Sequence, residues 1–180
     1  RAQGAYIHNL EPFWDHYWKN GENDKLGWRL EYNMKHRGDV YATHGLGPVA
    51  QALDIHRGDR MKTLVAMDTK SVVGKSLVEE RTGQPCENFR NGDHTTTLIR
   101  TENGKVIEIQ HDVMTPQPYN RLYQLTGTKG FANKYPIEGY ALDAKQLNAS
   151  GVAPEVDNLN SHSFMPKKDM EALVQKYQHP

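Results

Sequence analysis

Alternating apolar and polar residues predict several strands along the chain. In the N-terminal stretch GAYIHNL, Tyr6, His8 and Leu10 alternate with Ile7 and Asn9. The stretches RMKTLVAMD and NRLYQLTGTKGFANKYPIEGYAL are also rich in strand-forming residues, and GTKG in the second is a turn signal. We therefore expect a first strand at the N-terminus and further strands in the middle of the chain.

The clearest local pattern is HTTTLIRTENGKVIEIQHDV, in which two β-rich runs flank Asn103 and Gly104. An Asn-Gly pair easily adopts the positive φ angles that a tight hairpin turn requires. We predict a hairpin here, with Glu102 and Lys105 facing each other beside the turn.

A helix is predicted from about Gly45, because four apolar residues share one helical face. Pro48 suits its first turn, where a missing N–H has no partner to lose. Thr43 is a plausible cap. The four apolar residues are Leu46, Val49, Ala50 and Leu53.

Other segments have weaker patterns. SVVGKSLVEE suits a short helix, and KLGWRLEYNMK is ambiguous between a strand and an extended loop. Residues from about 145 to 166 are rich in Asn, Ser, Pro and Gly, so we expect an extended surface segment there. A terminal helix over about 166–178 follows from the spacing of four residues, namely Met170, Leu173, Val174 and Tyr177.

Together these elements predict an α+β fold, an open and mostly antiparallel β-sheet with a few helices. The 180 residues suffice for one domain, and a net charge of zero argues against nucleic-acid or membrane-surface binding through bulk charge. No apolar run approaches the roughly 18–20 residues of a membrane span. The single cysteine, Cys86, cannot form an intrachain disulfide.

The stretch RGDVYATHGLGPVAQAL places Tyr41, Thr43 and His44 at the entrance of the predicted helix. A helix N-terminus has free N–H groups, and a histidine there can transfer protons near neutral pH. The three side chains could line a substrate pocket. Alternatively, Thr43 only caps the helix while His44 and Tyr41 pack, and spacing alone slightly favours this structural interpretation.

Further candidates are Arg29, whose guanidinium could hold a hydroxyl pair or form a surface ion pair, and Tyr119, which follows two prolines. The nine histidines include no HExxH or zinc-type Cys/His spacing, so we expect no metal site. Neither a GxGxxG opening a βαβ unit nor a P-loop occurs. Aromatic residues that could stack on sugars or fill a core are dense in one region, namely Trp14, Tyr17, Trp18 and Trp28.

Three segments together resemble the C-terminal domain of glycoside hydrolase family 109, within the Gfo/Idh/MocA oxidoreductase superfamily. The resemblance covers roughly residues 4–135, and its most specific part is Y-x-T-H-G-L-G-P followed by R-G-D-R. The segments are GDVYATHGLGPVAQALDIHRGDRMKTLVAMDT, NGDHTTTLIRTENGKVIEIQHDV and TPQPYNRLYQLTGTKG.

The resemblance implies an NAD-dependent α-N-acetylgalactosaminidase-like glycosidase. Such an enzyme oxidises C3 of the sugar transiently, eliminates the glycosidic oxygen, adds water and regenerates NAD. It needs proton donors and acceptors but not the pair of catalytic carboxylates that most glycosidases use. The family's NAD-binding Rossmann domain precedes the C-terminal domain and is absent from this chain, so the isolated chain is expected to be inactive.

The resemblance also implies site residues. We expect His44 and Tyr41 to handle protons, Arg29 and Tyr119 to hold the sugar, and Tyr41 to touch the cofactor as well. Related dehydrogenases carry Asp-x-x-x-His at the catalytic histidine, but here Val40 takes the aspartate's place and Asp39 is one residue off. The positions matching the substrate-contacting residues are Tyr6, Arg29, Tyr41, Ala42, Thr43, His44 and Tyr119, with Tyr123 as the alternative to Tyr119.

The expected partners are a carbohydrate, the chain's own N-terminal Rossmann domain and, through an exposed sheet face, a second copy of the protein. The alternatives are the C-terminal domain of a Gfo/Idh/MocA sugar dehydrogenase and a non-enzymatic carbohydrate-binding or oligomerisation domain. The chain lacks an initiator Met and a signal-peptide core, so we expect a fragment or processed product. Its localisation is left open, with export or the periplasm as one option.

Overall fold

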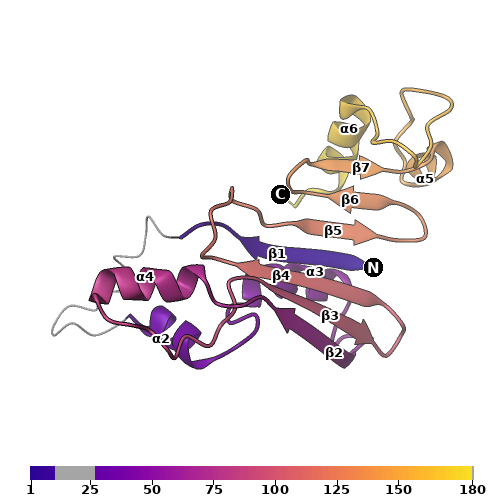
Figure 1. Ribbon diagram of the computed structural model, residues 1–180. Helices are drawn as coiled ribbons and strands as arrows, with labels where there is room; N and C mark the ends of the chain where they lie inside the picture. The colour runs from indigo at the N-terminus through magenta and orange to yellow at the C-terminus, as the bar shows by residue number, and fades with distance from the viewer. Residues whose placement is uncertain (11–26, 180) are drawn as a thin grey trace.

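A seven-stranded sheet of order β2-β3-β4-β1-β5-β6-β7 organises the chain in the computed structural model, which describes residues 1–10 and 27–179 (Figure 1). Every neighbouring pair is antiparallel except β1 and β4, which run parallel. The predicted α+β fold with an open, mostly antiparallel sheet is therefore confirmed. The strands are β1 (Ala2–Ile7), β2 (Met61–Asp68), β3 (Thr95–Thr101), β4 (Val106–Asp112), β5 (Tyr123–Thr126), β6 (Phe131–Asn133) and β7 (Gly139–Ala141).

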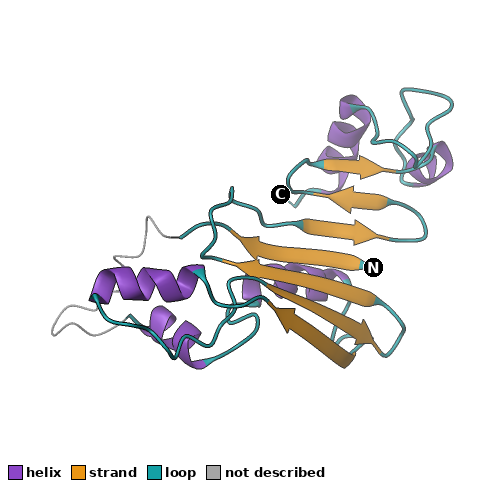
Figure 2. Cartoon of the chain, viewed as in Figure 1, coloured by secondary structure: helices purple, strands orange, loops and turns teal. Residues whose placement is uncertain are grey.

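The helices gather at three places around the sheet (Figures 1 and 2). One helix lies across the back of β1 and β4, two lie beyond the ends of these strands, and two lie beside β7. The face opposite the first helix is left open (Figure 2). The helix behind β1 and β4 is α3 (Thr43–Ala52). The two beyond the strand ends are α2 (Trp28–Lys35) and α4 (Val73–Thr82), and the two beside β7 are α5 (Ala144–Ala149) and α6 (Lys167–Tyr177).

The hairpin prediction is confirmed, because Gly104 has a φ of +78° between β3 and β4. The expected partnership beside the turn is wrong. Lys105 reaches Asp59, with its ammonium 3.3 Å from Asp59 Oδ2, while Glu102 pairs with Lys62 at 3.1 Å. The loop before β2 supplies the nearer opposite charge for Lys105.

Helix α3 confirms the predicted apolar face, since Val49 is fully buried and packs with Leu46 and Ala50. Two details of the prediction are wrong. The helix begins two residues earlier than expected, so Thr43 is its first residue rather than its cap, and the preceding Ala42 makes no side-chain cap hydrogen bond. For the same reason, Pro48 lies in the second turn and not the first.

The segment KLGWRLEYNMK forms helix α2 over residues 28–35, so neither the strand nor the extended loop is correct. Its buried Leu30 and Asn33 are three residues apart, which places them on one helical face. An ion pair between Glu31 and Lys35, four residues apart, joins successive turns. Period 3.6 therefore describes this short segment better than period 2.

The expectation of an extended surface segment over 145–166 is wrong at its start but not throughout, because residues 151–164 form no helix or strand and are mostly exposed. Helix α5 occupies its start, capped by Asp143, whose Oδ1 accepts a hydrogen bond from the Gln146 N–H at 2.7 Å. Leu147, Leu159 and Met165 are buried together against β7 and α6. The terminal helix is confirmed as α6.

Glycine at two positions lets α3 approach the sheet closely. A Cβ on Gly4 of β1 would overlap the carbonyl oxygen of Gly45, and one on Gly45 would lie 3.1 Å from Ile109 Cγ2. The start of α3 therefore lies directly on β1, which brings the residues preceding Gly45 to the carboxyl end of that strand.

The open face of the sheet carries exposed apolar residues near the β2 edge. Val65 and Met67 of β2 are 59% and 76% exposed, and Leu98 opposite Val65 is 49% exposed. We expected a second copy of the protein to bind through an exposed sheet face, and this surface is such a face. The homo-oligomer itself stays a prediction. Within residues 1–10 and 27–179, no helix is long and apolar enough to cross a bilayer.

Candidate functional site

One face of the sheet changes from apolar to polar along the parallel strands β1 and β4. Ala2 lies opposite Ile107 and Gly4 opposite Ile109, and then Tyr6 lies opposite His111. Helix α3 covers the apolar part, so the polar part begins where the helix begins. Carboxyl ends of neighbouring parallel strands are a common place for ligand sites in open sheets.

The start of α3 and the turn before it add two further rings to this polar end. The His44 and Tyr6 ring centroids are 4.5 Å apart, and those of Tyr41 and His44 are 4.9 Å apart. Tyr41 also meets Tyr6 edge-on at 5.6 Å. The close approach of Gly45 to β1 is what makes this three-ring cluster possible.

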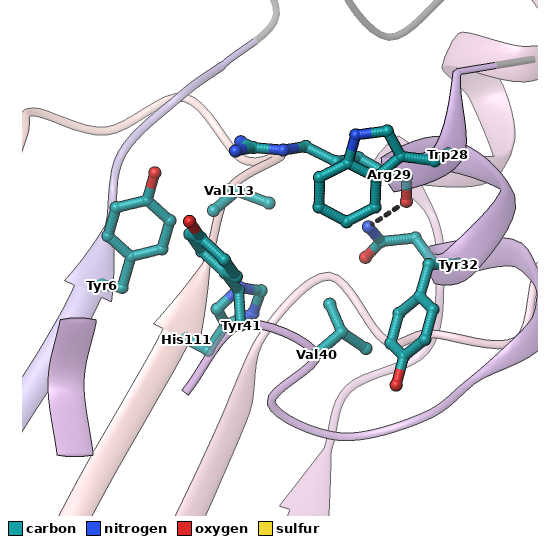
Figure 3. A pocket seen from close by; sticks show the side chains of 9 residues that line it. Tyr6, Trp28, Arg29, Tyr32, Val40, Tyr41, His111 and Val113 are labelled. Carbon is teal, nitrogen blue, oxygen red and sulfur yellow. Dashed lines mark hydrogen bonds between the residues drawn. The ribbon is translucent and has the colours of Figure 1, made fainter. Parts of the chain in front are cut away.

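Helix α2 contributes a cation. The Arg29 guanidinium carbon lies 5.0 Å from the Tyr41 ring and 5.0 Å from the Trp28 ring, between the two (Figure 3). Both distances fall within the range of a cation–π interaction. Trp28, Arg29, Tyr41 and His111 line a small pocket with a cavity volume of about 20 Å³.

The segment after β4 completes the cluster. Tyr119 meets His8 edge-on, with ring centroids 5.2 Å apart. The Arg121 guanidinium carbon lies 5.3 Å from the Tyr6 ring and 5.4 Å from the Tyr119 ring. Two guanidiniums, three phenols and three imidazoles, that of His111 included, therefore converge from five separate segments of the chain.

The structure brings together most, but not all, of the predicted site residues. Tyr41 and His44 are half-buried and accessible, Tyr119 is 47% exposed, and Tyr6 is packed beneath them with 6% exposure. Ala42 and Thr43 instead line a separate open depression on the outer side of α3. These two residues share the turn with Tyr41 and His44 but not the cluster of side chains.

Tyr123, the alternative to Tyr119, packs beside the apolar cluster that includes Val49 and Ile107. Burial raises the pKa of its phenol. Among the two tyrosines, Tyr119 is the one that contacts the rings of the cluster. Of the aromatic-dense region, Trp14, Tyr17 and Trp18 lie outside the described residues, and only Trp28 can be placed.

The imidazoles of His44 and His8 favour their neutral forms. The pKa of His44 is lowered by burial first, and then by the positive charges of Arg121 and Arg29. The pKa of His8 is lowered by burial and by Arg121, with smaller contributions from His44 and His111. A neutral imidazole at neutral pH can accept a proton from a bound ligand.

Sequence reasoning missed three residues of this end of the sheet, His8, His111 and Arg121, and it considered Asp39 only as a partner of His44. The alternation in GAYIHNL already placed His8 on the side of Tyr6, and the alternation in VIEIQHD places His111 on the side of Ile107 and Ile109. The sequence alone could therefore have predicted that both histidines lie on a buried strand face. For Arg121 we find no comparable signal, because its position depends on how the segment after β4 folds back.

Asp39 has a partner other than the one that the Asp-x-x-x-His pattern would give it. Its Oδ1 lies 4.0 Å from His111 Nε2 and accepts a hydrogen bond from the Tyr41 N–H at 3.1 Å. Asp39, which is one residue away from the position in the dehydrogenase pattern, thus faces a histidine on β4 rather than the one on α3.

Buried side-chain atoms without a hydrogen-bond partner concentrate at this end of the sheet. Such atoms are uncommon in folded proteins, and functional sites are one reason for them. In the described part of the chain, no group of three or more His, Cys, Asp or Glu side chains is placed to hold a metal ion. The unpartnered atoms at the site are His8 Nε2, Asp39 Oδ2, His111 Nε2, Asn120 Oδ1 and Arg121 Nε.

Comparison with known sequences gives a family for the whole chain. The family described as "Glycosyl hydrolase 109, C-terminal domain" matches residues 1–180. "Glycosyl hydrolase family 109 protein 5" of Phocaeicola vulgatus is 84% identical over 180 residues, which are 100% of this chain and 35% of that protein. "Glycosyl hydrolase family 109 protein" of Porphyromonas gingivalis is 58% identical over 179 residues, 99% of this chain and 36% of that protein. The chain thus spans about a third of the length of the curated relatives that it matches.

Proposed function

The chain belongs to glycosyl hydrolase family 109, and from this premise we propose that it is the substrate-binding half of an NAD-dependent glycosidase acting on α-N-acetylgalactosaminides. The observation that carries the proposal is the cluster at the carboxyl ends of β1 and β4. In it, Tyr6, Tyr41 and His44 meet within 5.6 Å, beside two guanidiniums. The relatives are about three times longer than this chain, which leaves room for the Rossmann domain that would bind most of the cofactor.

The residues of the cluster suit one wall of a site for a sugar and a nicotinamide ring. The unpartnered Nε of Arg121 and the half-buried phenol of Tyr41 offer polar contacts, and Tyr41 would touch the cofactor. When bound, NAD would supply the acceptor for the C3 hydride of the sugar, whose oxidation acidifies the C2 proton and permits elimination and water addition.

This chain's own residues would manage protons and charge. His44, kept neutral by burial and by Arg121 and Arg29, would accept or return a proton at the sugar. Tyr41 would donate a hydrogen bond to a sugar oxygen. Arg29 and Tyr119 would hold the ring, and the positive charges would favour the negative charge that develops as the C2 proton leaves.

The carboxylates flanking His111 are not arranged as a glycosidase pair. Asp112 accepts hydrogen bonds from the Thr115 hydroxyl at 2.6 Å and from two backbone N–H groups, and Asp39 faces His111. Most glycosidases need two carboxyl groups on either side of the scissile bond. Among the described residues, this cluster supports chemistry by imidazole and phenol instead.

The decisive experiment uses the full-length protein with bound NAD and a chromogenic α-N-acetylgalactosaminide. Release of the chromophore without added oxidant would support the glycosidase. Net accumulation of NADH would favour the alternative, a Gfo/Idh/MocA sugar dehydrogenase, and sugar binding without either product would favour a carbohydrate-binding or oligomerisation domain.

Replacing His44 tests its role within that assay. His44→Ala should lower turnover by about 10²–10⁴-fold, the usual contribution of a proton-transferring side chain. His162→Ala is the matched control, because His162 is exposed in the loop before α6. An unchanged rate for His44→Ala would return His44 to a structural role.

A further inference from the structure

Asp39 and His111 form a buried pair to which the proposed chemistry gives no role. Their side chains are 9% and 3% exposed, and Asp39 Oδ1 lies 4.0 Å from His111 Nε2. Asp39 Oδ2 and His111 Nε2 both lack a hydrogen-bond partner. Leaving a buried polar atom unpaired costs folding free energy, because the atom loses its hydrogen bonds to water. Two such atoms on adjacent ionisable side chains therefore suggest a functional reason.

Each member of the pair contacts one tyrosine of the site. Asp39 accepts the hydrogen bond from the Tyr41 N–H at 3.1 Å, so it fixes the backbone that carries this phenol. His111 lies opposite Tyr6 in the parallel register of β1 and β4, with ring centroids 6.0 Å apart. A shift of either side chain would therefore be passed to a phenol of the cluster. Figure 3 shows His111 beneath the Tyr41 ring.

The charge of the pair depends on how many protons it holds. With one proton it is neutral overall, whichever residue carries that proton. With no proton it is negative, and with two it is positive, and burial opposes both charged forms. Burial accordingly raises the pKa of Asp39 and lowers the pKa of His111, while the mutual attraction of the two charges acts in the opposite direction on each.

From this geometry we infer that Asp39 and His111 share one proton and act as positioning residues that hold Tyr41 and Tyr6 in place. The 4.0 Å separation can close to a hydrogen bond when a ligand orders the site, because such contacts often tighten only in the complex. The pair itself stands on the buried geometry, whereas its effect on catalysis rests on the proposed function.

Several other groups face the pair and could influence its proton. Asp112 and His94 lie on the β4 and β3 side, and their charges act on His111 in opposite directions. The remaining groups lie on the site side, and these are His8, Tyr6, Tyr41 and the charged Arg29.

The shared proton can be tested without any assay of activity. In full-length protein labelled with ¹⁵N-histidine, the His111 resonances are assigned by their loss in His111→Gln and then titrated with pH. Asp39→Asn keeps the Oδ1 acceptor for Tyr41 but cannot hold the proton, so it should change the His111 shifts and their titration. Asp54→Asn, at an exposed aspartate, should leave them unchanged. A His111 titration that is identical with and without the Asp39 carboxylate would overturn the shared proton.

The positioning role is tested by kinetics of the same proteins. Asp39→Asn and His111→Gln should each lower kcat on the order of 10²-fold with KM little changed, as small misplacements of reacting groups do. Each should also move the pH profile of kcat, and the double variant should be no slower than either single variant.

His162→Gln is the matched control, since His162 is exposed in the loop before α6. An unchanged kcat and pH profile in both single variants, losses that multiply in the double variant, or an equal loss in His162→Gln would each overturn the positioning role. If either Asp39→Asn or His111→Gln does not fold, the pH profile of kcat in the other variant still tests the positioning role. Wild-type protein that releases no sugar would refute the proposed function alone, because the ¹⁵N titration still decides whether the pair exists.

Discussion

Each end of the sheet face covered by α3 buries an aspartate, and the two carboxylates are held very differently. At the hairpin end, Asp59 accepts hydrogen bonds from the Arg60 N–H at 2.8 Å and the Asn103 N–H at 3.1 Å, with the Lys105 ammonium 3.3 Å away. At the site end, Asp39 accepts one hydrogen bond, from the Tyr41 N–H, and its Oδ1 lies 4.0 Å from His111 Nε2. Oδ2 of each aspartate makes no hydrogen bond, but that of Asp59 has the Lys105 ammonium beside it.

The two environments shift the pKa of the carboxyl group in opposite directions. Burial raises the pKa of Asp59, but hydrogen bonds from Thr101, Asn103 and Arg60 and the contact with Lys105 outweigh it and bring the pKa to about 2. At Asp39, burial is the larger effect and the pKa is raised. A carboxylate that supports the fold is thus supplied with donors, whereas one at the site is left short of them.

The largest expected effect comes from separating α3 from the sheet, which disrupts both ends at once. In Gly4→Ala, the new methyl group would overlap the backbone carbonyl of Gly45, which cannot move without the helix. We expect a loss of about 3 kcal/mol in the free energy of unfolding, measured by urea denaturation.

The control for this substitution is Gly47→Ala, on the same helix, where a Cβ meets nothing within 4 Å. It should be neutral or stabilise the chain by up to about 1 kcal/mol through helix propensity. If both alanine variants had the same urea midpoint as the wild type, a glycine at position 4 would not be needed for α3 to pack on β1.

The next effect concerns the hairpin end alone. Because the folded-state pKa of Asp59 is depressed to about 2 from 3.8, its ionised form stabilises the fold above pH 3.8. That contribution is lost as the pH falls through about 2. Asp59→Asn should therefore lower the free energy of unfolding at neutral pH and flatten its decline between about pH 4 and pH 2, measured by urea denaturation across this range.

Asp54→Asn in the same loop is the matched control for Asp59→Asn. Asp54 is 67% exposed, and its contact with Arg57 is 3.8 Å long, so its removal should change stability little. A wild-type pH dependence in Asp59→Asn would show that the network around Asp59 does not stabilise the chain through its charge.

The hairpin end was far more accessible from the sequence than the site end. The Asn103-Gly104 turn, the alternation of the flanking strands and the apolar face of α3 all depend on neighbouring residues, so local rules predicted them. The family resemblance supplied Tyr41, His44 and Arg29, which the structure then brings together.

The rest depends on contacts between distant segments. The parallel pairing of β1 with β4 joins residues about 100 positions apart, and it alone places Tyr6 beside His111. No local pattern contains that register. From the sequence, Asp39 could therefore be considered only as a partner of His44, which is close to it along the chain. Helix α2 was missed because eight residues give too few repeats to separate a period of 3.6 from a period of 2.

The smallest expected effect has the opposite sign to that of Asp59, and it therefore tests the comparison most directly. Because the folded-state pKa of Asp39 is raised above 3.8, the protonated form is tolerated at low pH and stability is lost as the pH rises through the raised value. Asp39→Asn removes this loss and keeps the acceptor for the Tyr41 N–H. We expect it to raise the free energy of unfolding at pH 7 by about 0.5–2 kcal/mol, as replacements at functional sites often do.

The gain should shrink towards zero as the pH is lowered below the unfolded-state value of 3.8, because the wild-type carboxyl group is then protonated as well. Urea denaturation of wild type and Asp39→Asn at both pH values measures the difference. An asparagine variant less stable than wild type at pH 7 would mean that the ionised Asp39 supports the fold as Asp59 does. The unpartnered Oδ2 of Asp39 would then not reduce the free energy of unfolding, so its presence would need no functional explanation. The contrast between the two ends of the sheet would disappear.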